Sequence, residues 1–393
     1  MFNAFIEALN ELEELSRGSS LIDIVYLGKC QDGYELPSFI VKGKSTECII
    51  IIGMPHGNEP IGFWICVDFI KKIIQAPYPP EHCYFIVPIL DYDVGVKNIW
   101  IRRKFDLQRF MNYNYLNTVA DQIEFTYGQN KMAQQLSGLI RQAGFLKAKC
   151  AVFIHQTPTI SGGYFYTNIT GKRCHKSIQQ AFALHGIPPE PFPQGKNVER
   201  KDVGIFGVFK RCSIPIKFSE HGYSCQEYFD SVFNMKFLTV EIPFFYTGFY
   251  LSSQPVKLKY CDQILIFFKQ CESLRDKITA HLKCDFAQES LYWLNSSIEA
   301  NNIIQKILQR GTDTVAAIDL CQIIKHLFYK LSYIAMAKRI ANDKISAGAK
   351  TIQNDGLLIL EQYKQILGLT LVDNDVGFSI FTKCLEALRG NLL

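Results

Sequence analysis

The sequence lacks several features that would each define a class of protein. No stretch approaches the roughly 20 uninterrupted apolar residues that a membrane-spanning helix needs, so we expect no membrane span. The first 16 residues contain four glutamates and have neither a basic start nor an apolar stretch, so they predict an amphipathic helix and not a secretory signal. A cytoplasmic protein is the expectation, and export by a route that needs no signal stays open.

Paired cysteine spacings such as C-x-x-C are also missing, although the chain of 393 residues contains 13 cysteines. An odd number of singly spread cysteines is typical of reduced thiols and not of a disulfide framework. The charge is nearly balanced, with 42 lysine and arginine residues against 37 acidic residues, and the basic residues are scattered. A nucleic-acid partner is therefore not expected.

The most informative stretch is Cys48-Ile-Ile-Ile-Ile-Gly-Met-Pro-His56-Gly-Asn-Glu59-Pro. Four consecutive isoleucines predict a central strand that is covered on both faces. His56 and Glu59 follow its carboxyl end, which is where ligands bind in open α/β sheets. An imidazole nitrogen and a carboxylate oxygen from one turn can converge on a single cation, and zinc suits this mixed ligand set.

Other apolar runs predict the rest of a sheet. Helical patterns separate the inner strands, which indicates a mostly parallel, doubly wound mixed sheet with flanking helices, and thus an α/β fold. An entry hairpin is expected ahead of the central strand. The hairpin strands are predicted over residues 22–27 and 34–41, and further inner strands over residues 83–87, 151–155 and 237–243.

The character of the chain changes near residue 255. Beyond it, apolar residues recur at helical spacing with no strand between them. We therefore predict an α/β catalytic domain over residues 1–253 and an all-α C-terminal domain over residues 254–393. The helical domain is expected to mediate self-association or partner docking.

Two more of the predicted inner strands end in residues that can do chemistry, His155 and Glu241. Strand ends of a parallel sheet lie side by side, so we expect these residues to meet His56 and Glu59. Two histidines and one carboxylate leave the fourth position of a tetrahedral zinc ion open, which is the catalytic pattern. Glu241 is the candidate general base.

A polar loop between residues 91 and 117 carries the arginines Arg102, Arg103 and Arg109. An arginine can hold a substrate carboxylate through two hydrogen bonds, or it can stabilise a developing oxyanion. We expect this loop to supply substrate recognition and charge stabilisation.

Three segments together resemble the zinc metallocarboxypeptidases, a family related to the succinylglutamate desuccinylase and aspartoacylase group. They are Pro-His56-Gly-Asn-Glu59-Pro, Phe-Ile-His155 and Thr-Val-Glu241-Ile-Pro, and the likeness extends over roughly residues 20–250. The resemblance implies a zinc carboxypeptidase-like fold, one zinc ion held by His56, Glu59 and His155, and Glu241 as the catalytic glutamate.

The same resemblance extends to the substrate side of the site. In the family a Trp-Arg segment precedes Asp-x-Asn-Arg, whose Asn and Arg hold the C-terminal carboxylate of the peptide. Here Trp100-Ile-Arg102-Arg103 and Asp106-Leu-Gln108-Arg109 are similar, with Gln108 in place of Asn. The oxyanion-stabilising role falls to Arg102 or Arg103, and both stay open.

The family also has a tyrosine upstream of the catalytic glutamate that covers the substrate. Tyr223 and Tyr228 are both candidates. The combined prediction is a zinc-dependent metallocarboxypeptidase that hydrolyses the C-terminal or γ-linked amino acid of a peptide with a free carboxylate. Two alternatives stay open: an aspartoacylase-like or desuccinylase-like amidohydrolase that acts on small N-acyl amino acids, and a non-catalytic effector protein that binds a peptide tail.

Overall fold

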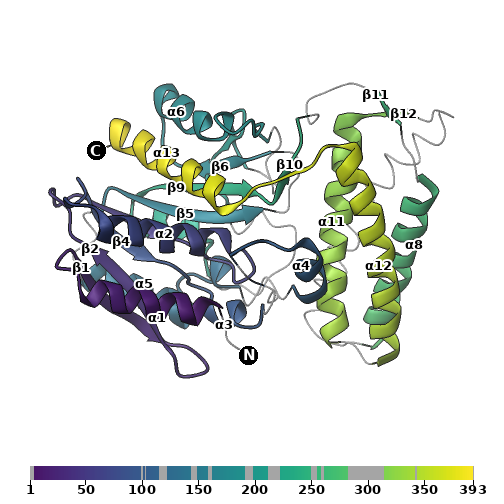
Figure 1. The fold of residues 1–393 in the computed structure, drawn as a ribbon, viewed down its shortest axis with the longest axis horizontal. Coiled ribbons are helices and arrows are strands. Elements are labelled where there is room, and N and C mark those ends of the chain that lie inside the picture. Colours follow the sequence, from purple (N-terminus) through teal and green to yellow (C-terminus); the bar gives the residue numbers. More distant parts are fainter. Residues whose placement is uncertain are drawn as a thin grey trace.

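The fold is centred on one mixed sheet of nine strands in the order β1-β2-β4-β3-β5-β9-β6-β8-β7 (Figure 1). The computed structural model describes residues 4–98, 101, 103–114, 122–142, 148–157, 162–190, 198–210, 222–248, 255–257, 261–281, 314–340 and 343–392. The strands are β1 (Ile22–Lys29), β2 (Glu35–Val41), β3 (Cys48–Ile52), β4 (Cys83–Val87), β5 (Cys150–Thr157), β6 (Tyr164–Thr167), β7 (Arg200–Asp202), β8 (Ile205–Phe206) and β9 (Lys236–Pro243).

The centre of the sheet is parallel. β3 pairs in parallel with β4 on one side and with β5 on the other, and β5 pairs in parallel with β9. The isoleucines at positions 49–52 of β3 have no exposed surface, as expected for a strand covered on both faces. Antiparallel pairs flank this centre, with the hairpin of β1 and β2 at one edge and β6 against β9 toward the other. The predicted mixed sheet with flanking helices is confirmed.

Four helices form a continuous row along one face of the sheet (Figure 1). α1 packs on α2, α2 on the C-terminal helix, and the C-terminal helix on α6. Aromatic contacts fix this row, since Phe69 of α2 meets Phe381 edge to face at 5.3 Å between ring centroids. The four helices are α1 (Ala4–Arg17), α2 (Ile61–Gln75), α6 (Lys172–Ala183) and α13 (Asn374–Leu392).

The opposite face is the one that carries the site. The register pairs His155 of β5 with Glu241 of β9, and Glu241 with Tyr164 of β6, so these three side chains share one face. Phe153 lies on the same face, and its ring meets Phe229 of α7 at 5.0 Å. α5 packs against β1, and α7 packs against β9. Their bounds are α5 (Lys131–Gln142) and α7 (Cys225–Ser231).

The described C-terminal part of the chain is mostly helical, as predicted, although three short strands depart from the predicted all-α domain. Three helices stand beside the sheet, with α12 between α8 and α11 (Figure 1). The chain leaves the sheet through β10 and returns through β13, which pairs with β10 before α13 begins. The domain boundary near residue 254 stays a prediction, and α13 packs on the sheet unit. The bounds are β10 (Phe245–Tyr246), β11 (Pro255–Lys257), α8 (Cys261–His281), β12 (Thr314–Ala316), α11 (Ala317–Ile340), α12 (Asp343–Ile366) and β13 (Thr370–Leu371).

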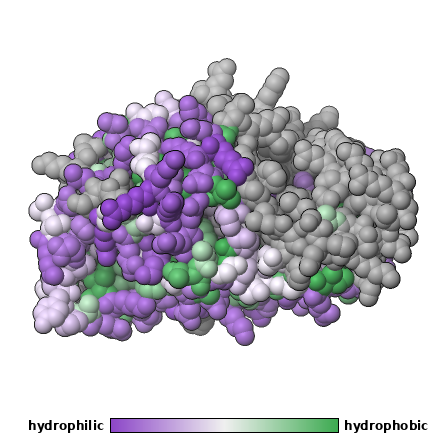
Figure 2. Space-filling view, turned by 90° about the horizontal axis from the view of Figure 1, so that it is seen from above, coloured by the Kyte–Doolittle hydropathy of each residue, from purple (hydrophilic) through white to green (hydrophobic). Residues whose placement is uncertain are grey.

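The described surface is largely polar on the face seen in Figure 2. On the face in Figure 2, hydrophilic residues dominate the coloured area and hydrophobic residues form small separate patches. Over the ranges given above, every helix is either too short or too polar to cross a lipid bilayer.

Candidate metal centre

The turn between β3 and α2 places His56 and Glu59 at the carboxyl end of the central strand. The start of α2 approaches β3 so closely that a Cβ on Gly62 would lie 1.3 Å from the carbonyl oxygen of Gly53. Only glycine fits there. The Gly57 N–H donates to Asp91 Oδ2 at 3.1 Å, and the Asn98 side-chain amide donates to the Gly57 carbonyl at 2.8 Å. The histidine and the glutamate therefore sit on a turn that is fixed from both sides.

β5 and β9 bring the other two predicted residues to the same place. His155 Nδ1 lies 3.0 Å from Glu59 Oε2, and the same oxygen accepts the Gln156 N–H at 3.1 Å. The His56 and His155 ring centroids are 5.1 Å apart. Glu241 is the register partner of His155 on the neighbouring strand.

These side chains can serve as ligands of one cation. One potential ligand atom from each of His56, Glu59 and His155 lies within 4.8 Å of the other two. His56 Nδ1 is buried without a hydrogen-bond partner, which is costly unless a ligand completes its environment. Two imidazoles and a carboxylate form the donor set of catalytic zinc sites, so the residues present fit the metal that the sequence predicts.

The electrostatics of the cluster also favour a cation. Burial raises the pKa of Glu59 and of Glu241 to about 7, and it lowers the pKa of His56 to about 4. Burial lowers the pKa of His155 as well. Within the described ranges no lysine or arginine forms an ion pair with Glu59 or Glu241. A bound divalent ion would supply the missing positive charge and hold both carboxylates ionised.

A third buried carboxylate, Glu124, was missed by the sequence analysis. It lies on the short 3-10 helix η2 (Ile123–Phe125), and its Oε2 is 4.0 Å from His155 Nε2. The Cys225 thiol donates to Glu124 Oε1 at 2.6 Å. Burial raises the pKa of Glu124 well above its usual range. The signal in the sequence is a carboxylate between two apolar residues, in Ile-Glu124-Phe, as Glu241 lies between Val and Ile.

The arginine loop is arranged differently from the strand ends. Trp100 and Arg102 lie outside the described residues. Arg103 donates to both carboxylate oxygens of Asp68 on α2, at 2.6 Å each. Its side chain is 53% exposed, so a surface ion pair holds it.

Gln108 and Arg109 lie on the exposed side of α4 (Leu107–Tyr113). Asp106 caps this helix by accepting the Arg109 N–H at 3.0 Å. The Arg109 side chain is 54% exposed and has only a long contact with Asp106, at 3.7 Å. Within the described residues, Gln108, Arg103 and Arg109 thus lie on the protein surface, and their predicted roles stay predictions.

The two candidate tyrosines differ in exposure. Tyr228 is buried and packs against Tyr127 at 5.5 Å between ring centroids. Tyr223 is 43% exposed, and its backbone pairs with that of Tyr127 through hydrogen bonds of 3.0 and 3.1 Å. An exposed ring can cover a substrate without moving and a buried one cannot; both assignments stay predictions.

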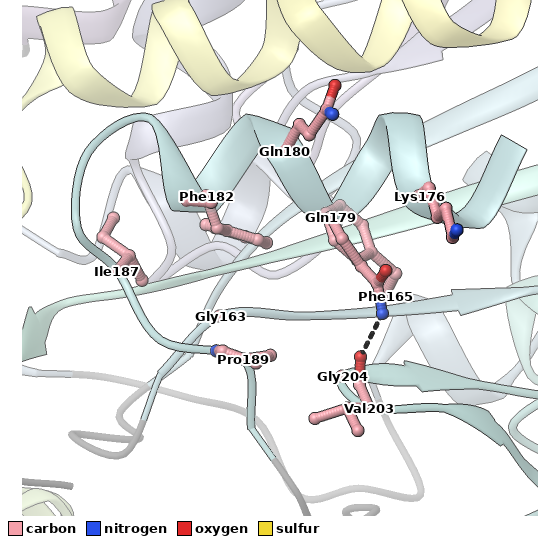
Figure 3. A pocket seen from close by; sticks show the side chains of 11 residues that line it. Gly163, Phe165, Lys176, Gln179, Gln180, Phe182, Ile187, Pro189, Val203 and Gly204 are labelled. Atoms are coloured by element: carbon pink, nitrogen blue, oxygen red, sulfur yellow. Dashed lines mark hydrogen bonds between the residues drawn. The ribbon is translucent and has the colours of Figure 1, made fainter. Parts of the chain in front are cut away.

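A cavity of about 410 Å³ lies elsewhere, between α6, β6 and the turn that joins β7 to β8 (Figure 3). Phe165, Phe182 and Ile187 line its apolar side. Phe165 pairs with Val240 and therefore points to the face opposite Tyr164 and Glu241. The cavity is thus separated from the candidate metal centre by the sheet.

Comparison with known proteins gives structural matches only. No family model and no curated protein matches the sequence. A Shewanella denitrificans protein, provisionally described as a metallopeptidase, matches over 61% of this chain and 80% of its own, at 11% identity and a TM-score of 0.43. A metallo-carboxypeptidase from Burkholderia cenocepacia matches over 59% and 58%, at 14% identity and a TM-score of 0.39. Thrombin activatable fibrinolysis inhibitor matches over 61% and 68%, at 10% identity and a TM-score of 0.41. Likenesses of this size leave the activity of the chain to be argued from its own residues.

Proposed function

We propose that this chain is a zinc-dependent metallocarboxypeptidase that releases the C-terminal or γ-linked amino acid of a peptide by attack of water. One observation carries the proposal: potential ligand atoms of His56, Glu59 and His155 converge within 4.8 Å at the carboxyl ends of β3 and β5. Glu241 adds a fourth chemical group from the next strand. Four residues thus lie at one edge of the sheet, although the first and the last of them are 185 positions apart in the sequence.

Each member of the cluster has a role in this proposal. His56, Glu59 and His155 hold the ion, and the backbone N–H of Gln156 keeps the Glu59 carboxylate oriented. Bound zinc supplies a Lewis acid that polarises the scissile carbonyl and lowers the pKa of water toward about 7. Glu241 accepts the proton of the attacking water and passes it to the leaving amine.

Recognition of the free carboxylate is assigned to the arginine loop. Among the described arginines of the loop, Arg109 is the better candidate, because its guanidinium forms only a long contact with Asp106. Gln108 precedes it on the exposed face of the same helix and would donate its amide to the carboxylate. Arg103 would first have to give up two short bonds to Asp68. Tyr223 would close over the bound residue.

We place the enzyme in the cytoplasm, where its unpaired cysteines would stay reduced. The mostly helical segment beyond residue 254 would dock a partner or a second copy of the chain.

The test combines metal analysis with a substrate panel. Purified protein should contain one zinc ion per chain, lose activity to a chelator and regain it with zinc. Peptides with varied C-terminal residues, including γ-linked glutamyl peptides, should be cleaved by the wild type and not by Glu241→Gln. Cleavage of N-acyl amino acids without cleavage of peptides would instead identify an amidohydrolase. Protein without stoichiometric zinc that binds peptides without cleaving them would identify a peptide-binding protein.

A further inference from the structure

The proposed function leaves one buried pair without a task, Glu124 and Cys225. The Glu124 side chain is 4% exposed and Cys225 is fully buried. Backbone hydrogen bonds between Tyr127 and Tyr223 tie their two segments together. Ser224 caps α7 by accepting the Glu227 N–H at 3.1 Å, which fixes Cys225 as the first residue of that helix. The pair is therefore held rigidly beside His155.

The two oxygens of Glu124 face different partners. Oε1 accepts the Cys225 thiol at 2.6 Å. Oε2 faces His155 Nε2 across 4.0 Å, and both of these atoms are buried without a hydrogen-bond partner. Each of these two buried atoms lacks a hydrogen bond. A small movement of the carboxylate toward the imidazole would form one between them.

The chemistry of a histidine ligand explains why such an oxygen would be useful. The other nitrogen of His155, Nδ1, lies on the side of Glu59, at 3.0 Å from its Oε2. A neutral imidazole can offer Nδ1 to a metal ion only when its proton is on Nε2. That Nε2–H then needs an acceptor, and carboxylates commonly fill this position behind metal-bound histidines.

We propose that Glu124 positions His155 for metal binding by accepting its Nε2–H, and that the Cys225 thiol holds Glu124 in the required orientation. The inference rests on the proposed metal site at His56, Glu59 and His155. In this arrangement the thiol is a hydrogen-bond donor and not a metal ligand. Glu124 is a positioning residue, because it acts on the ion through the imidazole.

The decisive experiment measures zinc affinity of the full chain by competition with a chelator. Glu124→Gln should weaken zinc binding by about 10- to 100-fold, the usual effect of removing such a partner. The metal-free variant should melt at the same temperature as the wild type or higher, because a buried carboxylate has been replaced by a neutral amide that still accepts the thiol. If the role of Glu124 were purely structural, the substitution would lower the melting temperature and leave the zinc affinity unchanged. Glu190→Gln, at a fully buried glutamate outside the site, is the matched control.

The cysteine provides a second, independent series. Cys225→Ser keeps a donor for Glu124 and should bind zinc as tightly as the wild type within a few-fold. Cys225→Ala removes the donor and should bind more weakly than Cys225→Ser. Cys384→Ala, at a buried cysteine of α13, controls for the loss of a buried thiol.

The outcomes separate this inference from the function on which it rests. Equal zinc affinity of Glu124→Gln and the wild type overturns the positioning role and leaves the metal site intact. A thiolate-to-cobalt charge-transfer band in the cobalt-loaded protein that disappears in Cys225→Ala also overturns it, because Cys225 would then bind the metal directly. Wild-type protein that binds no zinc overturns the proposed function itself.

Discussion

The strand ends and the arginine loop both carry residues that the sequence assigns to the site, and they are built in opposite ways. His155 and Glu241 are buried and held opposite each other by the register of two parallel strands. Arg103 and Arg109 are more than half exposed; Arg103 is held by two short bonds to Asp68, whereas Arg109 has only a long contact with Asp106 among the described residues. In a hydrogen-bonded sheet the strand register fixes the position of a side chain, whereas in a surface loop that position depends on nearby side chains. The strand-end residues should therefore show large and separable effects on mutation, and the loop residues smaller ones.

The largest effect is expected for His155→Ala. The substitution removes a potential metal ligand and leaves a cavity beside buried carboxylates, so stoichiometric zinc and peptidase activity should both be lost. Zinc affinity should fall by more than about 100-fold, which is the upper end of the loss caused by removing a group that only hydrogen-bonds to a metal ligand. Metal analysis after dialysis provides the measurement. His185→Ala is the control, since the imidazole of His185 contacts Ser379 of α13 and does not belong to the proposed ligand set.

Glu241→Gln should have the next largest effect. The amide keeps the shape of the side chain and cannot accept a proton, so kcat should fall by about 10²- to 10⁴-fold. Zinc content should stay at the wild-type value, because Glu241 is not among the proposed ligands. Steady-state kinetics and metal analysis on the same sample test both parts. Loss of zinc together with activity would make Glu241 a ligand and would contradict its role as the base.

The loop arginines should have smaller and unequal effects. Arg109→Ala should lower kcat/KM for peptides with a free carboxylate by about 10- to 100-fold, as expected for a lost hydrogen bond between charged groups. Arg103→Ala should lower it only a few-fold, because Arg103 already binds Asp68. The rate should be measured over a range of substrate concentrations to separate KM from kcat. The reverse order of the two effects would assign carboxylate recognition to Arg103.

The last prediction concerns stability and the buried carboxylate Asp91 under the metal-binding turn. Burial raises the pKa of Asp91 to about 7, while an aspartate in an unfolded chain titrates near about 3.9. The folded state thus keeps this proton to higher pH than the unfolded state, so Asp91 destabilises the fold increasingly as the pH rises from about 4 to about 7. Asp91→Asn removes this titration and can still accept the Gly57 N–H. Its melting temperature should therefore fall less than that of the wild type as the pH is raised through this range.

The control for this last experiment is Asp106→Asn in the loop. Asparagine caps a helix about as well as aspartate, so this variant should unfold within a few tenths of a kcal/mol of the wild type at neutral pH. If Asp91→Asn and Asp106→Asn gave the same change in the pH dependence of melting, the buried and exposed regions would not differ in the way proposed.

The sequence predicts the centre of the fold because that region is encoded locally. Continuous apolar runs give β3, β4, β5 and β9, and their boundaries agree with the structure to within two residues; the largest difference is at the end of β5, which continues through Gln156 and Thr157. The convergence of His56, Glu59 and His155 follows from the rule that parallel strands end at one edge.

Other features depend on contacts between segments that lie far apart in the sequence. Glu124 reaches the site only because η2 packs against the start of α7, where Cys225 meets its carboxylate. The predicted all-α region over residues 254–393 includes α13, but a helical pattern cannot tell which surface a helix covers, because an apolar stripe fits any apolar partner. Its place between α2 and α6 is specified by contacts such as Phe69 with Phe381.

The pairing of β10 with β13 has a consequence for how such a chain can change over evolution. The backbone leaves the sheet unit at Tyr246 and returns at Thr370, which pairs with Tyr246. The two ends of the segment between them therefore lie side by side. A segment anchored in this way can be lengthened, shortened or exchanged while the sheet and its closing helix stay joined. Selection could therefore remodel the helical attachment without disturbing the cluster at the strand ends.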